Sequence, residues 1–201
     1  AVGTVTAGLL SEYNFQKRDE LCKKFDIDII PAAPRYIGPE LRTYTDSQGR
    51  EVHTSYWGYE SVIHKTAIDS YDITTYFPMN DVQSVEDADR CAFPDPDWFD
   101  YSAVAETCEK YPDKAIVIGH EGPFQIITYL IEMDRFFMLM VDCPEAAQRL
   151  LDRMVEFEME YYRRTFEAAK GKVDMLRTHD DYGTQISLLF STDMWRRFFR
   201  E

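Results

Sequence analysis

The segment that most constrains the fold is residues 114–133, where an apolar strand pattern passes directly into an apolar helix pattern. The run "KAIVIG" (114–119) is of strand length, and "HEGPFQIITYLIEM" (120–133) follows it, with Pro123 suited to the first turn of a helix. A strand that is apolar along its whole length is typical of a parallel sheet covered on both faces. We therefore expect 114–119 to be a central strand of such a sheet.

Similar steps between helix and strand recur along the chain. Amphipathic spacing, capping residues and Gly or Pro stops predict helices over residues 11–25, 100–111, 144–171 and 191–199. Short apolar runs predict strands over residues 26–34 and 173–178. Asp142 is a candidate N-cap for the long helix, and Ser191 or Thr192 for the last one. Strands that alternate with helices indicate an α/β fold with a parallel sheet.

Residues 41–60, "LRTYTDSQGREVHTSYWGYE", interrupt this alternation. They have β-rich flanks around a polar turn that contains glycine, which predicts a hairpin outside the core sheet. We expect Tyr56 and Trp57, at the end of this segment, to fold back over another part of the molecule.

Composition and charge limit the class of protein. The chain has 201 residues, 45% of them hydrophobic, so it can bury a sizeable core, and we expect a single domain over 1–201. The net charge of −14 argues against nucleic acid or an anionic membrane as a partner, because phosphate binding needs clustered Lys and Arg. The longest apolar runs are shorter than the ~20 residues that span a bilayer, and we see no secretory leader pattern, so we expect a cytoplasmic protein. The four cysteines form no CxxC pair, which favours reduced core thiols over a disulfide framework or a thiolate zinc site.

The position of ligand sites in α/β folds selects candidate residues without any motif. Ligands bind beyond the carboxyl ends of the strands, which here means residues 33–36, 120–121 and 179–182. His120 and Glu121 could supply an acid or base and a carboxylate. Alternatively, Glu121 only favours the N-terminal dipole of the next helix.

The third of these loops, "HDDY", carries an imidazole and two adjacent carboxylates. His179, Asp180 and Asp181 are suitable donors for a cation, or for a polar cationic group such as a pyrrole or amine N–H. Neighbours on an extended segment point in opposite directions, so at most one Asp and His179 face the same space, and the two Asp residues are not separable from sequence. The alternative is a turn with helix capping.

Two further residues are candidates for substrate contacts. Tyr129 lies about one helical turn from Glu132 and should share a face with it, although core packing is the commoner use of a helical tyrosine. Arg35 follows an apolar strand, where a guanidinium could clamp a carboxylate, and an exposed loop Arg is the alternative. The standard nucleotide, elbow-serine and HExxH motifs are all missing from the sequence.

Several segments together resemble the uroporphyrinogen decarboxylase-like superfamily, which includes methyltransferases linked to cobalamin and coenzyme M. They are "VIGHEGPFQIITYLIEM", "PEAAQRLLDRMVEF" and "DDYGTQISLLFSTDMWRRFF", in this order and spacing, with "WGYE" and "FPDPDWFDY" in support. The resemblance covers roughly residues 20 to 200. It implies a TIM (β/α)8 barrel with its active site at the carboxyl ends of the strands. Because a barrel needs eight strands and we expect only three or four, the chain should be the N-terminal and middle part of such a barrel.

The resemblance also bears on function. It makes Tyr129 the counterpart of a pocket tyrosine in the decarboxylase. The decarboxylase has an arginine-rich loop and, after its first strand, a catalytic aspartate, whereas this chain has Pro34 and Arg35 near that position. The superfamily's methyltransferases bind zinc through a His-x-Cys pair and a later Cys, which we expect beyond residue 201.

We therefore expect an enzyme nearer the methyltransferase branches, with a small-molecule substrate, zinc, and a corrinoid as methyl donor or carrier, borne by a corrinoid protein. One alternative is a tetrapyrrole decarboxylase without a cofactor, in which Arg35 binds a carboxylate and an Asp stabilises the protonated pyrrole. Another is a non-catalytic binding or assembly module, with a homodimer covering the exposed sheet edges. The expected catalytic residues are Asp180, Asp181, His179 and His120. The expected substrate contacts are Tyr129, Arg35, Glu121 and Tyr182, and the metal ligands are unassigned.

Overall fold

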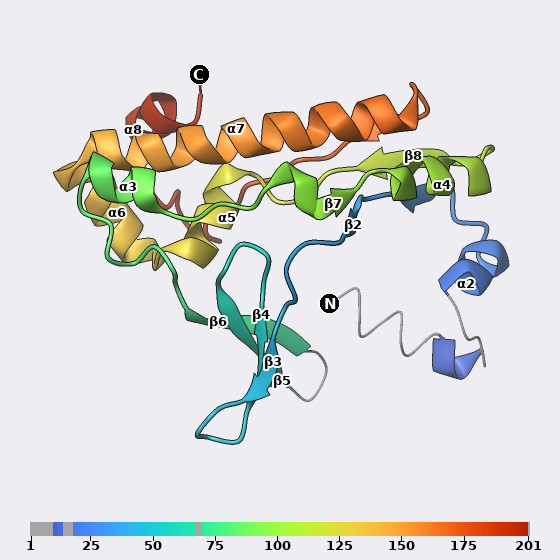
Figure 1. Ribbon diagram of the computed structural model, residues 1–201, viewed down its shortest axis with the longest axis horizontal. Coiled ribbons are helices and arrows are strands. Elements are labelled where there is room, and N and C mark those ends of the chain that lie inside the picture. The colour runs from blue at the N-terminus through green and yellow to red at the C-terminus, as the bar shows by residue number, and fades with distance from the viewer. Residues whose placement is uncertain (1–9, 14–17, 67–69, 201) are drawn as a thin grey trace.

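A computed structural model describes residues 10–13, 18–66 and 70–200 of the chain (Figure 1). Its central element is a parallel sheet of three strands, β1 (Ile29–Pro31), β8 (Ala115–Ile118) and β9 (Met175–Leu176), in the order β1-β8-β9. Ile30 lies opposite Ile116, and Ile118 opposite Leu176. The predicted α/β class with a parallel sheet is confirmed, and within the described part of the chain the sheet stays open rather than closing into a barrel.

Helices cover one face of this sheet. Side chains of β8 alternate in burial, so that Ile116 and Ile118 are buried while Ala115 and Val117 are only half-buried. The buried pair packs with Val104 of α4 (Ser102–Lys110) and Ala169 of α7 (Pro144–Ala169). The prediction that this strand is covered on both faces is therefore wrong for the described residues, because nothing among them packs fully over the second face.

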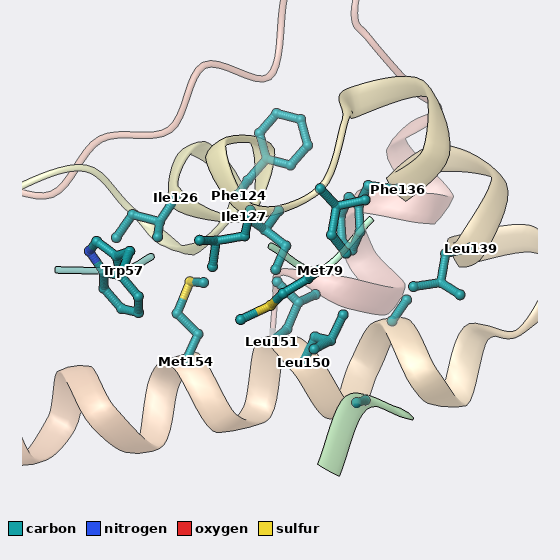
Figure 2. Packing of buried hydrophobic residues seen from close by; sticks show 14 of the residues in the cluster. Trp57, Met79, Phe124, Ile126, Ile127, Phe136, Leu139, Leu150, Leu151 and Met154 are labelled. Atoms are coloured by element: carbon teal, nitrogen blue, oxygen red, sulfur yellow. The ribbon is translucent and has the colours of Figure 1, made fainter. Parts of the chain in front are cut away.

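The larger core lies between α7 and four shorter helices, of which one precedes β8 in the sequence and three follow it. These helices are α5 (Pro123–Leu130), α6 (Met133–Asp142), α3 (Val85–Arg90) and α8 (Thr192–Phe198). Phe124, Ile127, Leu150 and Met154 are all nearly inaccessible to solvent in this core (Figure 2). The helical spacing of apolar residues along α7 therefore correctly predicts its buried face.

The sequence patterns predict neither α3 nor α6, and the presence of α6 corrects two expectations. The segment of α6 places an apolar run (136–141) directly after Asp134 and Arg135, and its buried side chains include Phe136 and Met140. Asp142 ends α6 and does not cap α7, whose N-cap is Cys143. Helix α5 ends at Leu130, so Glu132 does not share a helix face with Tyr129 as expected. Its carboxylate instead accepts a hydrogen bond from Asn80 at 3.0 Å.

The predicted hairpin is part of an antiparallel sheet that projects from the rest of the molecule (Figure 1). Its strands are β3 (Thr43–Thr45), β4 (Glu51–Thr54), β5 (Glu60–Lys65) and β6 (Ser70–Tyr76). Asp46 shapes the first turn by accepting backbone hydrogen bonds from Gln48 and Arg50. The next turn carries Trp57 back into the main core, where its ring lies 5.1 Å from that of Phe157, which confirms the expected return.

The remaining elements flank the central sheet. Helix α2 (Arg18–Lys24) precedes β1. After β1, the short strand β2 (Arg35–Tyr36) pairs antiparallel with β7 (Phe99–Asp100), which follows the 3-10 turn η1 (Pro96–Trp98). This pairing holds the chain that leaves β1 against the segment that leads into α4.

Arg153 should be the residue on the exposed side of α7 that matters most for stability. Its guanidinium donates to the carbonyl oxygens of Ala88, Asp89 and Cys91 at 2.6 to 3.0 Å, and it covers the ring of Phe93. Replacing Arg153 by Met should lower the free energy of unfolding by about 2 kcal/mol, because three carbonyls at the end of α3 lose a charged donor. Urea denaturation would measure this loss.

Arg149 provides the control for that experiment. It lies one turn earlier on α7 and pairs with Asp89 and Glu156 at the surface. Its replacement by Met should cost clearly less stability than that of Arg153, because surface ion pairs are screened by solvent. Equal losses for the two variants would contradict the role given to Arg153.

Candidate functional site at the strand ends

The segments that leave β8 and β9 run side by side. Glu121 and His179 form a parallel bridge, and the Gly122 N–H donates to the His179 carbonyl oxygen at 2.7 Å. Gly119 allows this approach, since it has φ +117° and a Cβ there would lie 1.8 Å from the carbonyl oxygen of Arg177. The loops expected to form the site are therefore brought together as predicted.

Asp180 points inward, against the beginning of α5. One carboxylate oxygen accepts from the backbone N–H of Gln125 at 2.8 Å, and the other accepts from the Tyr182 hydroxyl at 2.7 Å. A Cβ at Gly122 would lie 2.6 Å from the same carboxylate, so glycine lets Asp180 keep this position without shifting. Asp180 thus caps α5 from a different segment of the chain, the capping alternative considered for this loop, while it keeps a negative charge at the strand ends.

The other two polar residues of the loop are exposed. Asp181 and His179 both lie at the surface, on either side of the half-buried Asp180. Tyr182 follows, and its ring stacks on Phe124 at 5.3 Å between centroids. The structure therefore separates the two aspartates: Asp180 belongs to the inner wall and Asp181 faces solvent.

Glu121 and Tyr129 lie on a second wall, together with Tyr59 from the antiparallel sheet. The rings of Tyr59 and Tyr129 are 5.2 Å apart, and the Gln125 side chain donates to the Tyr129 hydroxyl at 3.2 Å. Burial raises the pKa of Tyr59 to about 12 and also raises that of Tyr129, and the charge of Glu121 adds to both shifts. These hydroxyls therefore stay protonated at neutral pH and can donate hydrogen bonds to a ligand.

His120 packs beneath α7, against the rings of Tyr161 and Tyr162. Its Nδ1 lies 2.7 Å from the backbone oxygen of Glu121, so this nitrogen carries the proton of the neutral ring. Burial lowers the pKa of His120, which keeps the imidazole neutral. Its other nitrogen is then an acceptor.

Glu158 belongs to the site although the strand-end rule does not select it. One oxygen of its carboxyl group lies 3.9 Å from Nδ1 of His120 and has no hydrogen-bond partner among the described residues. Burial, with the charge of Asp180, raises the pKa of Glu158 to about 7. The signal in the sequence is its spacing, because Glu158 lies four residues after buried Met154 and three before buried Tyr161, on the inner face of α7.

Arg35 does not point toward these residues. Its guanidinium donates to Asp100 and to Glu106, both at 3.1 Å, and its side chain is 57% exposed. The acidic partners already use the donors that a substrate carboxylate would need. The substrate contact predicted for Arg35 would require these ion pairs to open.

A comparison with known protein families identifies the family of the chain. Residues 71–200 match the family model of uroporphyrinogen decarboxylase (URO-D). This chain belongs to the uroporphyrinogen decarboxylase family. The resemblance of its sequence motifs to that family is thereby confirmed.

A solved structure adds the overall fold. A methyltransferase from Methanosarcina mazei matches with a TM-score of 0.55 at 22% identity, over 72% of this chain and 42% of the methyltransferase chain. The present chain therefore spans less than half the length of that neighbour. A search of curated proteins finds no match.

The described residues do not fit the zinc ion expected from the family's methyltransferases. In the described ranges, no three His, Cys, Asp or Glu side chains lie together in a way that could hold a metal ion. All four cysteines are free thiols, and Cys22 and Cys108 are buried, as expected for core residues.

None of the described helices is both long enough and apolar enough to span a membrane.

Proposed function

We propose that this chain forms part of a methyltransferase-type member of the uroporphyrinogen decarboxylase family, which transfers a methyl group between a small molecule and a corrinoid borne by a partner protein. The observation that carries the proposal is the charge at the strand ends. Glu121, Glu158 and Asp180 all lie there, and the nearby Arg35 is engaged by two acids.

This charge distribution disfavours an acidic tetrapyrrole. A substrate with several carboxylates would meet three carboxyl groups in a partly buried space, where like charges repel strongly. The decarboxylase alternative needs a guanidinium for those carboxylates, and Arg35, the candidate from the sequence, is already paired. A neutral or cationic methyl substrate meets no such repulsion.

The residues at the strand ends have separate tasks in this proposal. Tyr129 and Tyr59 donate hydrogen bonds that orient the substrate, and Asp180 holds the start of α5 in place. His120 offers an acceptor nitrogen beneath α7. When bound, the corrinoid supplies the methyl-carrying cobalt. The residues of this chain would accelerate the transfer by orienting the methyl substrate and keeping water away from it.

The test is methyl transfer by the full-length protein. It would be mixed with reduced cobalamin and a panel of methylated small molecules, and the visible spectrum of the corrinoid would report methylation. Replacing Tyr129 by Phe should lower kcat/KM by about tenfold or more, since an orienting hydrogen bond is lost.

Tyr44 is the matched control. It is an exposed tyrosine of β3 whose hydroxyl donates to Glu60 and not to a residue assigned to the site. Replacing Tyr44 by Phe should leave kcat/KM unchanged. Release of carbon dioxide from uroporphyrinogen, without any methylation of cobalamin, would replace this proposal with the decarboxylase.

A further inference from the structure

A cavity of about 220 Å³ lies between the carboxyl end of the sheet and α7. It lies next to the wall that carries Glu121 and Tyr129, but other residues line it. Five of its lining residues are aromatic: Tyr36, Tyr56, Phe99, Tyr161 and Tyr162. His120, Thr165 of α7 and small or aliphatic strand-end residues complete the wall. The volume of the cavity leaves room for a ligand of roughly five to seven heavy atoms.

The aromatic wall is held in place by contacts between its own rings. Tyr36 stacks on Tyr56 at 5.7 Å, Tyr56 meets Phe99 edge to face at 5.3 Å, and Phe99 meets Tyr161 in the same way at 5.1 Å. These rings come from β2, the turn after β4, β7 and α7, which are distant in the sequence. A ligand would therefore find the wall already assembled and would not have to order it.

A carboxyl group lies just behind the cavity wall, 3.9 Å from Nδ1 of the lining residue His120. Glu158 lies one helical turn before Tyr161 and Tyr162 on the same face of α7, and its side chain is only 12% exposed. Its contact on the cavity side is His120, and in the described part of the chain it forms no ion pair with Lys or Arg. Burial raises the pKa of Tyr56 and Tyr162, and the charges of Glu121 and Glu158 raise both further. The aromatic wall therefore lies in a negative potential.

We propose that this cavity binds a methylated ammonium cation, with the aromatic rings around its methyl groups and Glu158 as its counter-charge. Ring faces attract such cations electrostatically, because the ring quadrupole places negative charge on the faces. A quaternary ammonium has no N–H to satisfy, which suits a wall with few exposed acceptors. It also compensates a carboxylate that otherwise lacks a partner.

Binding of this cation is independent of the proposed function, whereas its role as the methyl substrate rests on that function. In that role, the C–N bond breaks and its electron pair stays on nitrogen, which leaves as a neutral amine. The methyl group bonds to the reduced cobalt of the corrinoid, which supplies the electron pair for the new bond. Charge and atoms then balance without another reactant.

Calorimetric titration of the full-length protein at pH 8 tests the binding. Choline would be compared with 3,3-dimethylbutan-1-ol, its neutral isostere. Choline should bind at least tenfold more tightly, which corresponds to about 1.4 kcal/mol. Equal affinities, or no choline binding, would overturn the proposal and identify at most an apolar cavity.

Two substitutions locate the site. Glu158→Gln should weaken choline binding about tenfold and leave the isostere unaffected, and Tyr162→Leu should weaken choline about fivefold. Glu156→Gln is the control, because this exposed glutamate of the same helix pairs with Arg149, and it should not change the affinity. If Glu156→Gln and Glu158→Gln weaken choline binding equally, the affinity depends only on the net charge of the protein, which would contradict the proposed site.

The two proposals fail in different ways. If choline binds as expected but no methylated compound transfers its methyl group to cobalamin, the proposed function is wrong and the cation site stands. If a neutral methyl donor reacts and choline does not bind, the cation site is wrong and the proposed function stands.

Discussion

Replacing Gly119 by Ala should lower the free energy of unfolding by about 4 kcal/mol or more, a loss that only severe steric conflicts produce. The new Cβ would lie 1.8 Å from the carbonyl oxygen of Arg177, and the backbone at residue 119 has φ +117°. Relief would require β8 and β9 to separate, because the obstructing atom is backbone and cannot rotate away. Urea denaturation would measure the loss, and absence of soluble protein would count as the same result.

Gly49 is the control for this substitution. It also has a positive φ, +77°, but a Cβ there meets nothing within 4 Å. Gly49→Ala should therefore cost only about 1 to 2 kcal/mol, from backbone strain alone. If the two variants lose the same stability, the close packing of β8 against β9, and with it the assembly of the site, is wrong.

Replacing Glu158 by Gln should raise the free energy of unfolding at pH 8 by about 3 kcal/mol. The pKa of this carboxyl is about 7 in the folded protein against an ordinary value of 4.5, and each pKa unit corresponds to about 1.36 kcal/mol. The folded state thus holds a proton that the unfolded state releases. Stability in the native protein is full below about pH 4.5 and declines as the pH rises toward 7.

Denaturation of both proteins at pH 5 and pH 8 would check this prediction. The advantage of Glu158→Gln should be small at pH 5 and reach its full size at pH 8. His120 has a lowered pKa and acts in the opposite sense, but it is present in both proteins, so its contribution cancels to first order. An advantage that is the same at both pH values would show that Glu158 is already fully ionised or exposed.

The same substitution links stability to the proposed binding. A variant that is more stable and yet binds choline less well cannot have lost binding through misfolding. This opposition is expected for a functional residue, because a buried carboxylate without a partner is unfavourable for folding and favourable for binding a cation.

Local patterns predict most elements of the main body. Strand β8 and helix α7 follow from the length and spacing of apolar residues, which depend on the chain itself. Helix α6 escapes such patterns because its apolar residues continue those of α5 without a clear stop, and the break at Ile131 appears only in the backbone. Strand β6 carries little apolar alternation and escapes them too, since its pairing with β5 supplies the order.

The candidate site, too, can be predicted from the sequence only in part. The strand-end rule selects His120, Glu121, His179 and Asp180 from the sequence alone, because the carboxyl ends of parallel strands must meet at one edge. The rule cannot distinguish Asp180 from Asp181. Which carboxylate turns inward depends on the position of the first turn of α5, whose Gln125 N–H binds Asp180. The rule cannot place Arg35 in ion pairs either, because Asp100 and Glu106 are distant in sequence.

By itself, the sequence determined the α/β class, the family and the loops in which chemistry should be sought, because these follow from local periodicity and from motifs along the chain. Only the tertiary structure placed Glu158 beside His120 and gathered five aromatic rings around one cavity. The physical reason is that burial and charge are set by neighbours from other segments. A glutamate in an amphipathic helix becomes a buried, unpaired carboxyl group only when the surrounding elements have closed over it.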